Sequence, residues 1–128
     1  MSKIILASSA LLALLKNESG TDTVESLLGQ SVMSSVTVSE TATVLLELGM
    51  SNREVQECLS PLISLIMPFD EEQAFYAATL SRQTKRMRLS FEDRACLALG
   101  IKMKVPVYTA NKTWKNLPLE TPTIKFIR

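Results

Sequence analysis

The side chains best suited to chemistry lie in residues 89–114, LSFEDRACLALGIKMKVPVYTANKTW. This stretch predicts a helix capped by Ser90, with Asp93 in its first turn, where the helix dipole favours a carboxylate. The β-branched run VPVYTAN then predicts a buried strand that ends at Thr109 and Asn111. A unit of this kind brings the helix start and the carboxyl end of the strand to the same edge of an α/β sheet, where such folds bind ligands.

The composition limits the chemistry that these residues can perform. The 128 residues include no histidine, which excludes histidine as a general base or as a zinc ligand. The formal net charge of +1 gives no overall signature of nucleic-acid binding, so contact with RNA would need a local basic patch. Cys58 and Cys96 fall inside helical patterns, which favours buried thiols in a reducing compartment over a disulfide.

The apolar run at residues 4–15 has the outline of a secretory signal because it follows Lys3 and contains small residues. However, it ends in the polar sequence KNE without an A-x-A-like cleavage site, and it is too short to cross a bilayer. We interpret this run as a strand at 3–6 and a helix at 9–16, which form the start of a cytoplasmic protein.

Apolar periodicity and capping residues predict strands that alternate with helices along the rest of the chain. Further helices are expected at 22–28, 37–48 and 52–59, the last capped by Ser51 or Asn52, and after Asp70 and Ser90. Further strands are expected at 31–34, 64–68 (short and buried), 105–111 and 123–127 (an edge strand). This alternation implies βαβ crossovers, so we expect one α/β domain over residues 1–128, with a mainly parallel central sheet flanked by helices.

Four segments resemble the PIN-domain ribonucleases, in particular the VapC toxins of type II toxin–antitoxin pairs. LSFEDRACLALG and PVYTANKTW are similar to the family patterns LSLGDRACLALA and PVLTADRAW. IILASSALLALLKNE resembles IVLDSSALLALLxxE, and SVMSSVTVSETATVL resembles the strand-to-helix segment of the family that carries one acid. The resemblance spans nearly the whole chain and implies a PIN-like three-layer α/β fold.

The resemblance also implies a metal site. In the family fold, the positions of Ala7, Glu40, Asp93 and Asn111 converge on one crevice. Carboxylates held this close repel one another, and a divalent cation such as Mg²⁺, with Mn²⁺ as an alternative, relieves that repulsion. Such an ion supports hydrolysis of RNA phosphodiester bonds without histidine. Considered by spacing alone, Glu40 and Asp93 are helix-start acids and Asn111 is a turn residue.

Two of these four positions lack the acid of the family. Ala7 supplies neither charge nor lone pair, so Glu40 and Asp93 are the remaining charged ligands, and we expect weaker metal binding and impaired hydrolysis. Asn111 occupies a position that varies in the family, and its side-chain carbonyl is a weak ligand. A deliberate Asp-to-Ala change in a toxic nuclease explains Ala7, and so does a natural nuclease-dead PIN module that binds RNA or protein. An unrelated small α/β binding domain is a third interpretation.

Other polar residues are expected around this crevice. Ser9 matches a hydroxyl position of the family, although an N-cap role explains it equally well. Thr109 is a hydroxyl at the end of a strand. The basic segment at 81–90 leads into the helix of Asp93, which predicts a rim that binds the phosphate backbone of RNA, with a solvated helix end as the alternative. The cations of this rim are Arg82, Lys85, Arg86, Arg88 and Arg94.

Apolar stripes on the two central helices bear on partners. Val44, Leu45 and Leu48 lie on one helix and Val55 and Leu59 on the next, and burial in the core is the default interpretation. VapC-like proteins use these two helices as a clamp for a segment of a small antitoxin. The resemblance therefore implies a VapB-like antitoxin, a toxin homodimer, an RNA substrate, and operator DNA reached only through the antitoxin. No membrane association is expected.

Overall fold

The computed structural model describes residues 2–128, and its strands form a single five-stranded sheet. The strands are β1 (Ile4–Leu6), β2 (Ser31–Ser34), β3 (Leu65–Met67), β4 (Val107–Thr109) and β5 (Ile124–Phe126). Their order is β3-β2-β1-β4-β5, and every neighbouring pair is parallel. The predicted parallel sheet is confirmed, and β1 lies at its centre.

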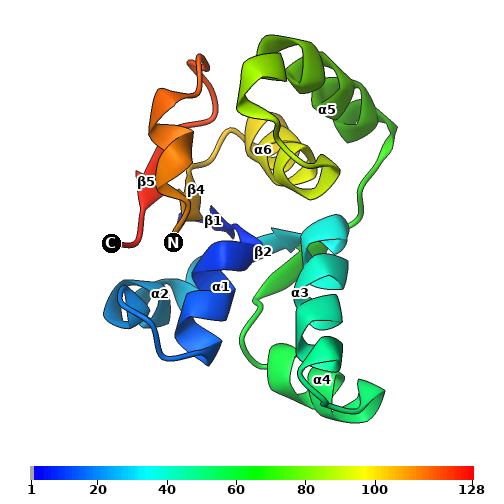
Figure 1. Ribbon diagram of the computed structural model, residues 1–128, viewed down its shortest axis with the longest axis vertical. Coiled ribbons are helices and arrows are strands. Elements are labelled where there is room, and N and C mark those ends of the chain that lie inside the picture. Colours follow the sequence, from blue (N-terminus) through cyan, green and yellow to red (C-terminus); the bar gives the residue numbers. More distant parts are fainter. Residues whose placement is uncertain (1) are drawn as a thin grey trace.

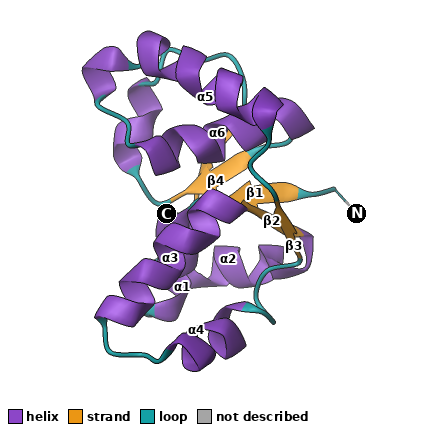
Figure 2. Ribbon diagram, turned by 90° about the vertical axis from the view of Figure 1, so that its right-hand side faces the viewer, coloured by secondary structure: helices purple, strands orange, loops and turns teal. Residues whose placement is uncertain are grey.

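Helices cover both faces of this sheet. They are α1 (Ser8–Leu15), α2 (Thr21–Leu27), α3 (Ser35–Glu47), α4 (Asn52–Leu59), α5 (Glu71–Gln83) and α6 (Phe91–Met103), with 3-10 segments at Leu28–Gln30, Lys85–Met87 and Lys112–Asn116. Helices α5 and α6 lie on one face and α1 to α4 on the other (Figure 1; Figure 2). The predicted three-layer α/β fold is therefore confirmed.

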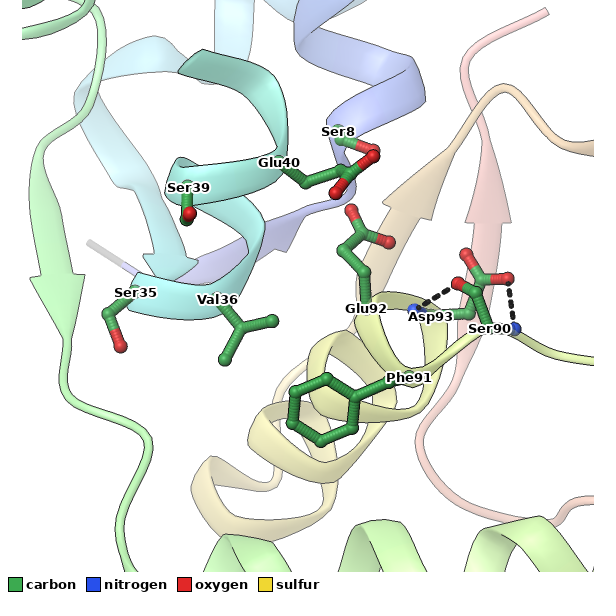
Figure 3. Close-up of a pocket in the computed structure, with 9 residues that line it drawn as sticks. All are labelled: Ser8, Ser35, Val36, Ser39, Glu40, Ser90, Phe91, Glu92 and Asp93. Carbon is green, nitrogen blue, oxygen red and sulfur yellow. Dashed lines mark hydrogen bonds between the residues drawn. The ribbon is translucent and has the colours of Figure 1, made fainter. Parts of the chain in front are cut away.

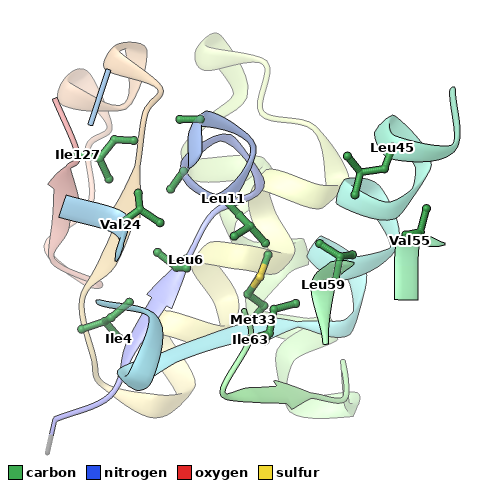
Figure 4. Packing of buried hydrophobic residues seen from close by; sticks show 12 residues of the cluster. Ile4, Leu6, Leu11, Val24, Met33, Leu45, Val55, Leu59, Ile63 and Ile127 are labelled. Carbon is green, nitrogen blue, oxygen red and sulfur yellow. The ribbon is translucent and has the colours of Figure 1, made fainter. Parts of the chain in front are cut away.

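The core consists of one apolar cluster on each face of the sheet. Because successive side chains of a strand point to opposite faces, Leu6 joins the cluster beneath α1 to α4 (Figure 4), whereas Ile5 joins the cluster beneath α6. Gly100 allows α6 to approach β4 closely, since a Cβ at this position would lie 2.6 Å from Cγ2 of Val107. The contact between α6 and the centre of the sheet positions the start of α6 relative to β1 and β2.

Side-chain caps determine where several helices begin. Ser51 and Glu54 form a capping box at α4, in which the Glu54 amide donates to Ser51 Oγ at 3.1 Å and the Ser51 amide donates to Glu54 Oε1 at 2.8 Å. Ser34 caps α3, which therefore begins at residue 35 instead of the predicted 37. Asp70 caps α5, as the sequence predicts.

The prediction of a buried strand at 64–68 is wrong in one respect. Strand β3 forms there, but it lies at the edge of the sheet, with Leu65 38% and Ile66 47% exposed. A short apolar run is compatible with burial under a helix or with an apolar surface at an edge, and periodicity does not separate the two.

The structure also bears on the state of the two cysteines and on whether a helix could span a membrane. Cys58 and Cys96 are both free thiols, and the predicted burial holds for Cys96, which is fully buried, but not for Cys58, which is only partly buried. Within residues 2–128, no helix combines the length and the apolar character needed to span a membrane.

Candidate functional site

A pocket of about 760 Å³ opens at the carboxyl edge of the sheet, where the chain leaves β1 and β2. The amino-terminal ends of α1, α3 and α6 meet there (Figure 3). Each helix start carries partial positive charge and unsatisfied amide groups, so this position favours anionic groups. The pocket is lined by Ser8, Ser35, Val36, Ser39, Glu40, Ser90, Phe91, Glu92 and Asp93.

The structure brings Glu40 and Asp93 into this same pocket, although they are far apart in the sequence. Glu40 is an exposed residue in the second turn of α3. Asp93 is half-buried and held by a capping box at the start of α6. The Ser90 amide donates to Asp93 Oδ2 at 3.1 Å, and the Asp93 amide donates to Ser90 Oγ at 3.0 Å. Asp93 therefore caps the helix with one oxygen while its other oxygen, Oδ1, stays outside this capping pair.

Glu92 is the pocket carboxylate that sequence reasoning did not select as a candidate ligand. Its side chain extends from the first turn of α6 toward Glu40 and Ser8 (Figure 3). Its Oε1 atom is buried and has no hydrogen-bond partner within the described structure. The signal available in the sequence was a glutamate beside Asp93, at a position where the family pattern quoted above has glycine.

The surroundings of Glu92 disfavour its ionised form. Burial raises the pKa of Glu92 from 4.5 to about 7. The Ser8 hydroxyl lowers this pKa, whereas the negative charges of Asp93 and Glu40 raise it further. A partly buried carboxylate beside two like charges is an arrangement that a bound cation stabilises.

Ala7 does not reach the pocket. It is 4% exposed and packs in the apolar cluster that includes Ile5, Val32 and Cys96. Its amide donates to the Tyr108 carbonyl at 2.9 Å, which joins β1 to β4. Ala7 is also the N-cap of α1, and its methyl group makes no capping hydrogen bond. Position 7 therefore provides neither a ligand nor a cap, and the next residue, Ser8, is the one that lines the pocket.

Asn111, Ser9 and Thr109 lie outside the set of residues that line the pocket. Asn111 Oδ1 accepts hydrogen bonds from the amide and the hydroxyl of Thr113, at 3.0 and 2.6 Å. The hydroxyls of Ser9 and Thr109 are 3.1 Å apart, and the Ala110 amide donates to Ser9 Oγ at 3.0 Å. The contacts of Ser9 and Thr109 join α1 to the end of β4, whereas Asn111 caps the 3-10 segment Lys112–Asn116, so structural roles account for all three side chains.

The basic residues of segment 81–90 lie beside a different hollow. Arg82, Lys85 and Arg86 line a separate pocket of about 460 Å³. Arg88 has a left-handed backbone conformation with φ of 52°. Arg94 donates to the Ala77 carbonyl at 3.1 Å and lies 5.8 Å from the centre of the Phe91 ring. None of the five lines the acidic pocket, so their contact with RNA stays a prediction.

The pocket fits a hard divalent cation by the chemistry of its donors rather than by a completed ligand cage. Within residues 2–128, no group of three or more His, Cys, Asp or Glu side chains has metal-binding geometry. The donors present are carboxylate and hydroxyl oxygens, which Mg²⁺ and Mn²⁺ prefer, and one of them is the buried, unpaired Oε1 of Glu92. Burial raises the pKa of the Cys96 thiol well above its usual value, which keeps this nearby sulfur neutral.

A protein-family model identifies the family to which this chain belongs. The model of the PIN domain matches residues 4–119. This chain belongs to the PIN-domain family. No curated protein matches the sequence of this PIN domain.

Solved structures share the fold of this PIN domain at low sequence identity. A DNA-bound VapBC from Salmonella typhimurium has a TM-score of 0.77 and 13% identity, with 100% of both chains covered. VapBC2 from Rickettsia felis, bound to a promoter DNA fragment, has a TM-score of 0.73 and 18% identity, covering 96% of this chain and 97% of that chain. The sarcin–ricin loop-cleaving toxin VapC20 from Mycobacterium tuberculosis has a TM-score of 0.69 and 18% identity, covering 91% and 96%.

Proposed function

We propose that this PIN domain is the toxin component of a type II toxin–antitoxin module and hydrolyses RNA phosphodiester bonds with Mg²⁺ or Mn²⁺, with an activity reduced by Ala7. One observation carries this proposal. Glu40 and Asp93, which correspond to acids in the family pattern, line the same pocket at the carboxyl edge of the sheet. A match of the PIN family over residues 4–119 supports the same conclusion.

The pocket residues have distinct roles in this proposal. PIN domains are generally dependent on divalent metals. Glu40 and Asp93 would hold the cation, Asp93 in an orientation already set by its capping box with Ser90. When bound, the cation lowers the pKa of water and offsets charge on the phosphate. The helix starts at Ser8 and Ser35 present amide groups that favour the anionic backbone of RNA.

Asn111 and Ala7 limit this activity for different reasons. Asn111 would have to give up its hydrogen bonds to Thr113 before its carbonyl could bind a metal. Ala7 removes one carboxylate from the site. Because the side chain of Ala7 is a buried methyl group that cannot bind a metal, it also favours a second candidate function. This second function is a nuclease-dead PIN module that binds RNA or protein.

We propose that a VapB-like antitoxin binds the apolar groove between α3, α4 and β3. This groove has a volume of about 600 Å³ and includes Val38, Val55, Leu59 and the exposed Ile66. The similar structures from Salmonella typhimurium and Rickettsia felis are VapBC complexes with DNA. By analogy, the toxin would form a homodimer and reach operator DNA only through its antitoxin.

Restoring the acid at position 7 tests the nuclease. We expect Ala7→Asp to raise cleavage of a short RNA in Mg²⁺ or Mn²⁺ by at least about 100-fold, because a carboxylate returns to the metal site. EDTA should abolish the gain. Ala7→Asn is the matched control, since its side chain has nearly the same shape without the charge.

Two results would contradict the proposed nuclease. One is RNA cleavage that does not rise in Ala7→Asp. The other is a gain that survives Glu40→Gln in the Ala7→Asp background. A protein that binds RNA but cleaves none in any variant would instead support the nuclease-dead module.

A further inference from the structure

We propose that Glu92 supplies the carboxylate that position 7 lacks, so that Glu92 would join Glu40 and Asp93 in holding the cation once these side chains turn toward it, because no three of the described acids already stand in metal-binding geometry. This inference rests on the metal-dependent function proposed above. It assigns a ligand role to a residue that sequence reasoning left aside.

The first argument is the direction of the side chains. Glu92 and Asp93 are consecutive residues in the first turn of α6, and consecutive helical residues point about 100° apart. Asp93 turns back toward Ser90, whereas Glu92 extends toward Glu40 and Ser8 (Figure 3). Glu92 is therefore the carboxylate of α6 that faces α1 and α3 directly.

The second argument is the unpaired oxygen of Glu92. In the described part of the chain, four buried side-chain polar atoms have no partner, and Oε1 of Glu92 is the one that belongs to a carboxylate. An unpaired buried polar atom is unfavourable, and a charged one more so. A divalent cation would give this oxygen the partner that the protein does not.

The third argument is the absence of a protein cation in the pocket. Within residues 2–128, the ion pairs involve Arg53, Lys102 and Arg128, and none of them includes Glu40, Glu92 or Asp93. Arg94, the basic residue beside Asp93, is directed instead to the Ala77 carbonyl. Three carboxylates without a counter-charge from the protein favour a cation from solution.

The fourth argument connects Glu92 to position 7. The Ser8 hydroxyl interacts with the Glu92 carboxylate, and Ser8 is the residue that follows Ala7 at the end of β1. The carboxylate of Glu92 thus reaches the point where the chain leaves β1. The Glu92 carboxylate therefore lies beside the residue that directly follows position 7.

Calorimetric titration of the full chain with Mn²⁺ at pH 8 tests this assignment without an activity assay. We expect Glu92→Gln to weaken Mn²⁺ binding by at least about 10-fold, since a charged ligand is lost. Glu47→Gln should bind as the native chain does, because Glu47 is exposed at the other end of α3. Circular dichroism of each variant checks that the fold is retained.

A rescue variant distinguishes a ligand from a residue that only shapes the pocket. If Glu92 substitutes for the acid at position 7, Ala7→Asp should restore the Mn²⁺ affinity lost in Glu92→Gln. Unchanged affinity in Glu92→Gln, with a loss in Glu40→Gln, would overturn the role of Glu92 and leave the proposed metal site intact. A native chain that binds no Mn²⁺ would overturn both.

Discussion

At the scale of single residues, Glu92 makes the free energy of unfolding depend on pH. Its pKa is 4.5 in the unfolded reference and about 7 in the fold, mainly because of burial. The folded chain therefore holds this proton to higher pH than the unfolded chain does. The associated stability is fully present below pH 4.5 and is lost as the pH rises through 7.

This dependence predicts the behaviour of Glu92→Gln in EDTA. At pH 8 the variant should be more stable than the native chain by about 1–2 kcal/mol, a value reduced from the full shift because the carboxylate is partly exposed. The difference should disappear well below pH 4.5, where the native side chain is protonated in both the folded and the unfolded state. Urea unfolding at several pH values measures it, and a difference that does not vary with pH would contradict the prediction.

Some residues of the candidate site could be predicted from the sequence, and others could not. Glu40 and Asp93 could be selected because the segments that carry them resemble the family pattern, and the structure brings both to one pocket. Glu92 could not be selected, because the direction of each acid depends on which of them pairs with Ser90. Likewise, the contact of Ser9 with Thr109 depends on the three-dimensional position of β4, whereas the contact of Asn111 with Thr113 is local and agrees with the turn role that spacing alone suggests.

At the scale of secondary-structure elements, boundaries were predictable where a local cap specifies them. Helix α4 begins at the predicted residue because Ser51 and Glu54 form a capping box that is visible in the sequence. Helix α3 begins earlier than predicted because Ser34 is both the last residue of β2 and the cap of α3. The exposure of β3 was not predictable, since it depends on where that strand lies in the sheet.

The packing of α6 against β4 gives a prediction at this scale. In Gly100→Ala, the added Cβ would lie 2.6 Å from Val107 and 2.9 Å from Pro122. We expect a net loss of about 1–2 kcal/mol in the free energy of unfolding, because the cost of overpacking exceeds the gain in helix propensity. Gly29→Ala is the control, since a Cβ added at Gly29 would meet no atom within 4 Å. Equal stabilities of the two variants would contradict this account of the α6–β4 contact.

At the scale of the whole molecule, a net charge of +1 conceals a separation of charge. Carboxylates gather in the pocket that contains Glu40. Arg82, Lys85 and Arg86 precede α6 in the sequence and line a separate hollow. RNA bound to this PIN domain would therefore contact basic residues on one part of the surface and approach the acidic pocket on another.

Salt dependence of RNA binding tests this separation. Arg86→Gln should weaken binding of a fluorescein-labelled single-stranded RNA and reduce the slope of log affinity against log salt by about 0.7, because one phosphate contact is lost. Lys125→Gln, an exposed residue of β5, should leave the slope unchanged. Fluorescence anisotropy at several salt concentrations measures both, and identical slopes for the two variants would exclude Arg86 from the interface.

The outer edge of β3 has a consequence for this PIN domain when no partner covers it. β3 pairs with β2 on one side only, and its exposed Leu65 and Ile66 adjoin unpaired backbone groups. Open strand edges of this kind promote edge-to-edge aggregation and also accept an added strand from another chain. If this PIN domain is the toxin proposed above, loss of its antitoxin would start two competing processes, attack on RNA and self-association through β3, and self-association would limit the amount of free toxin.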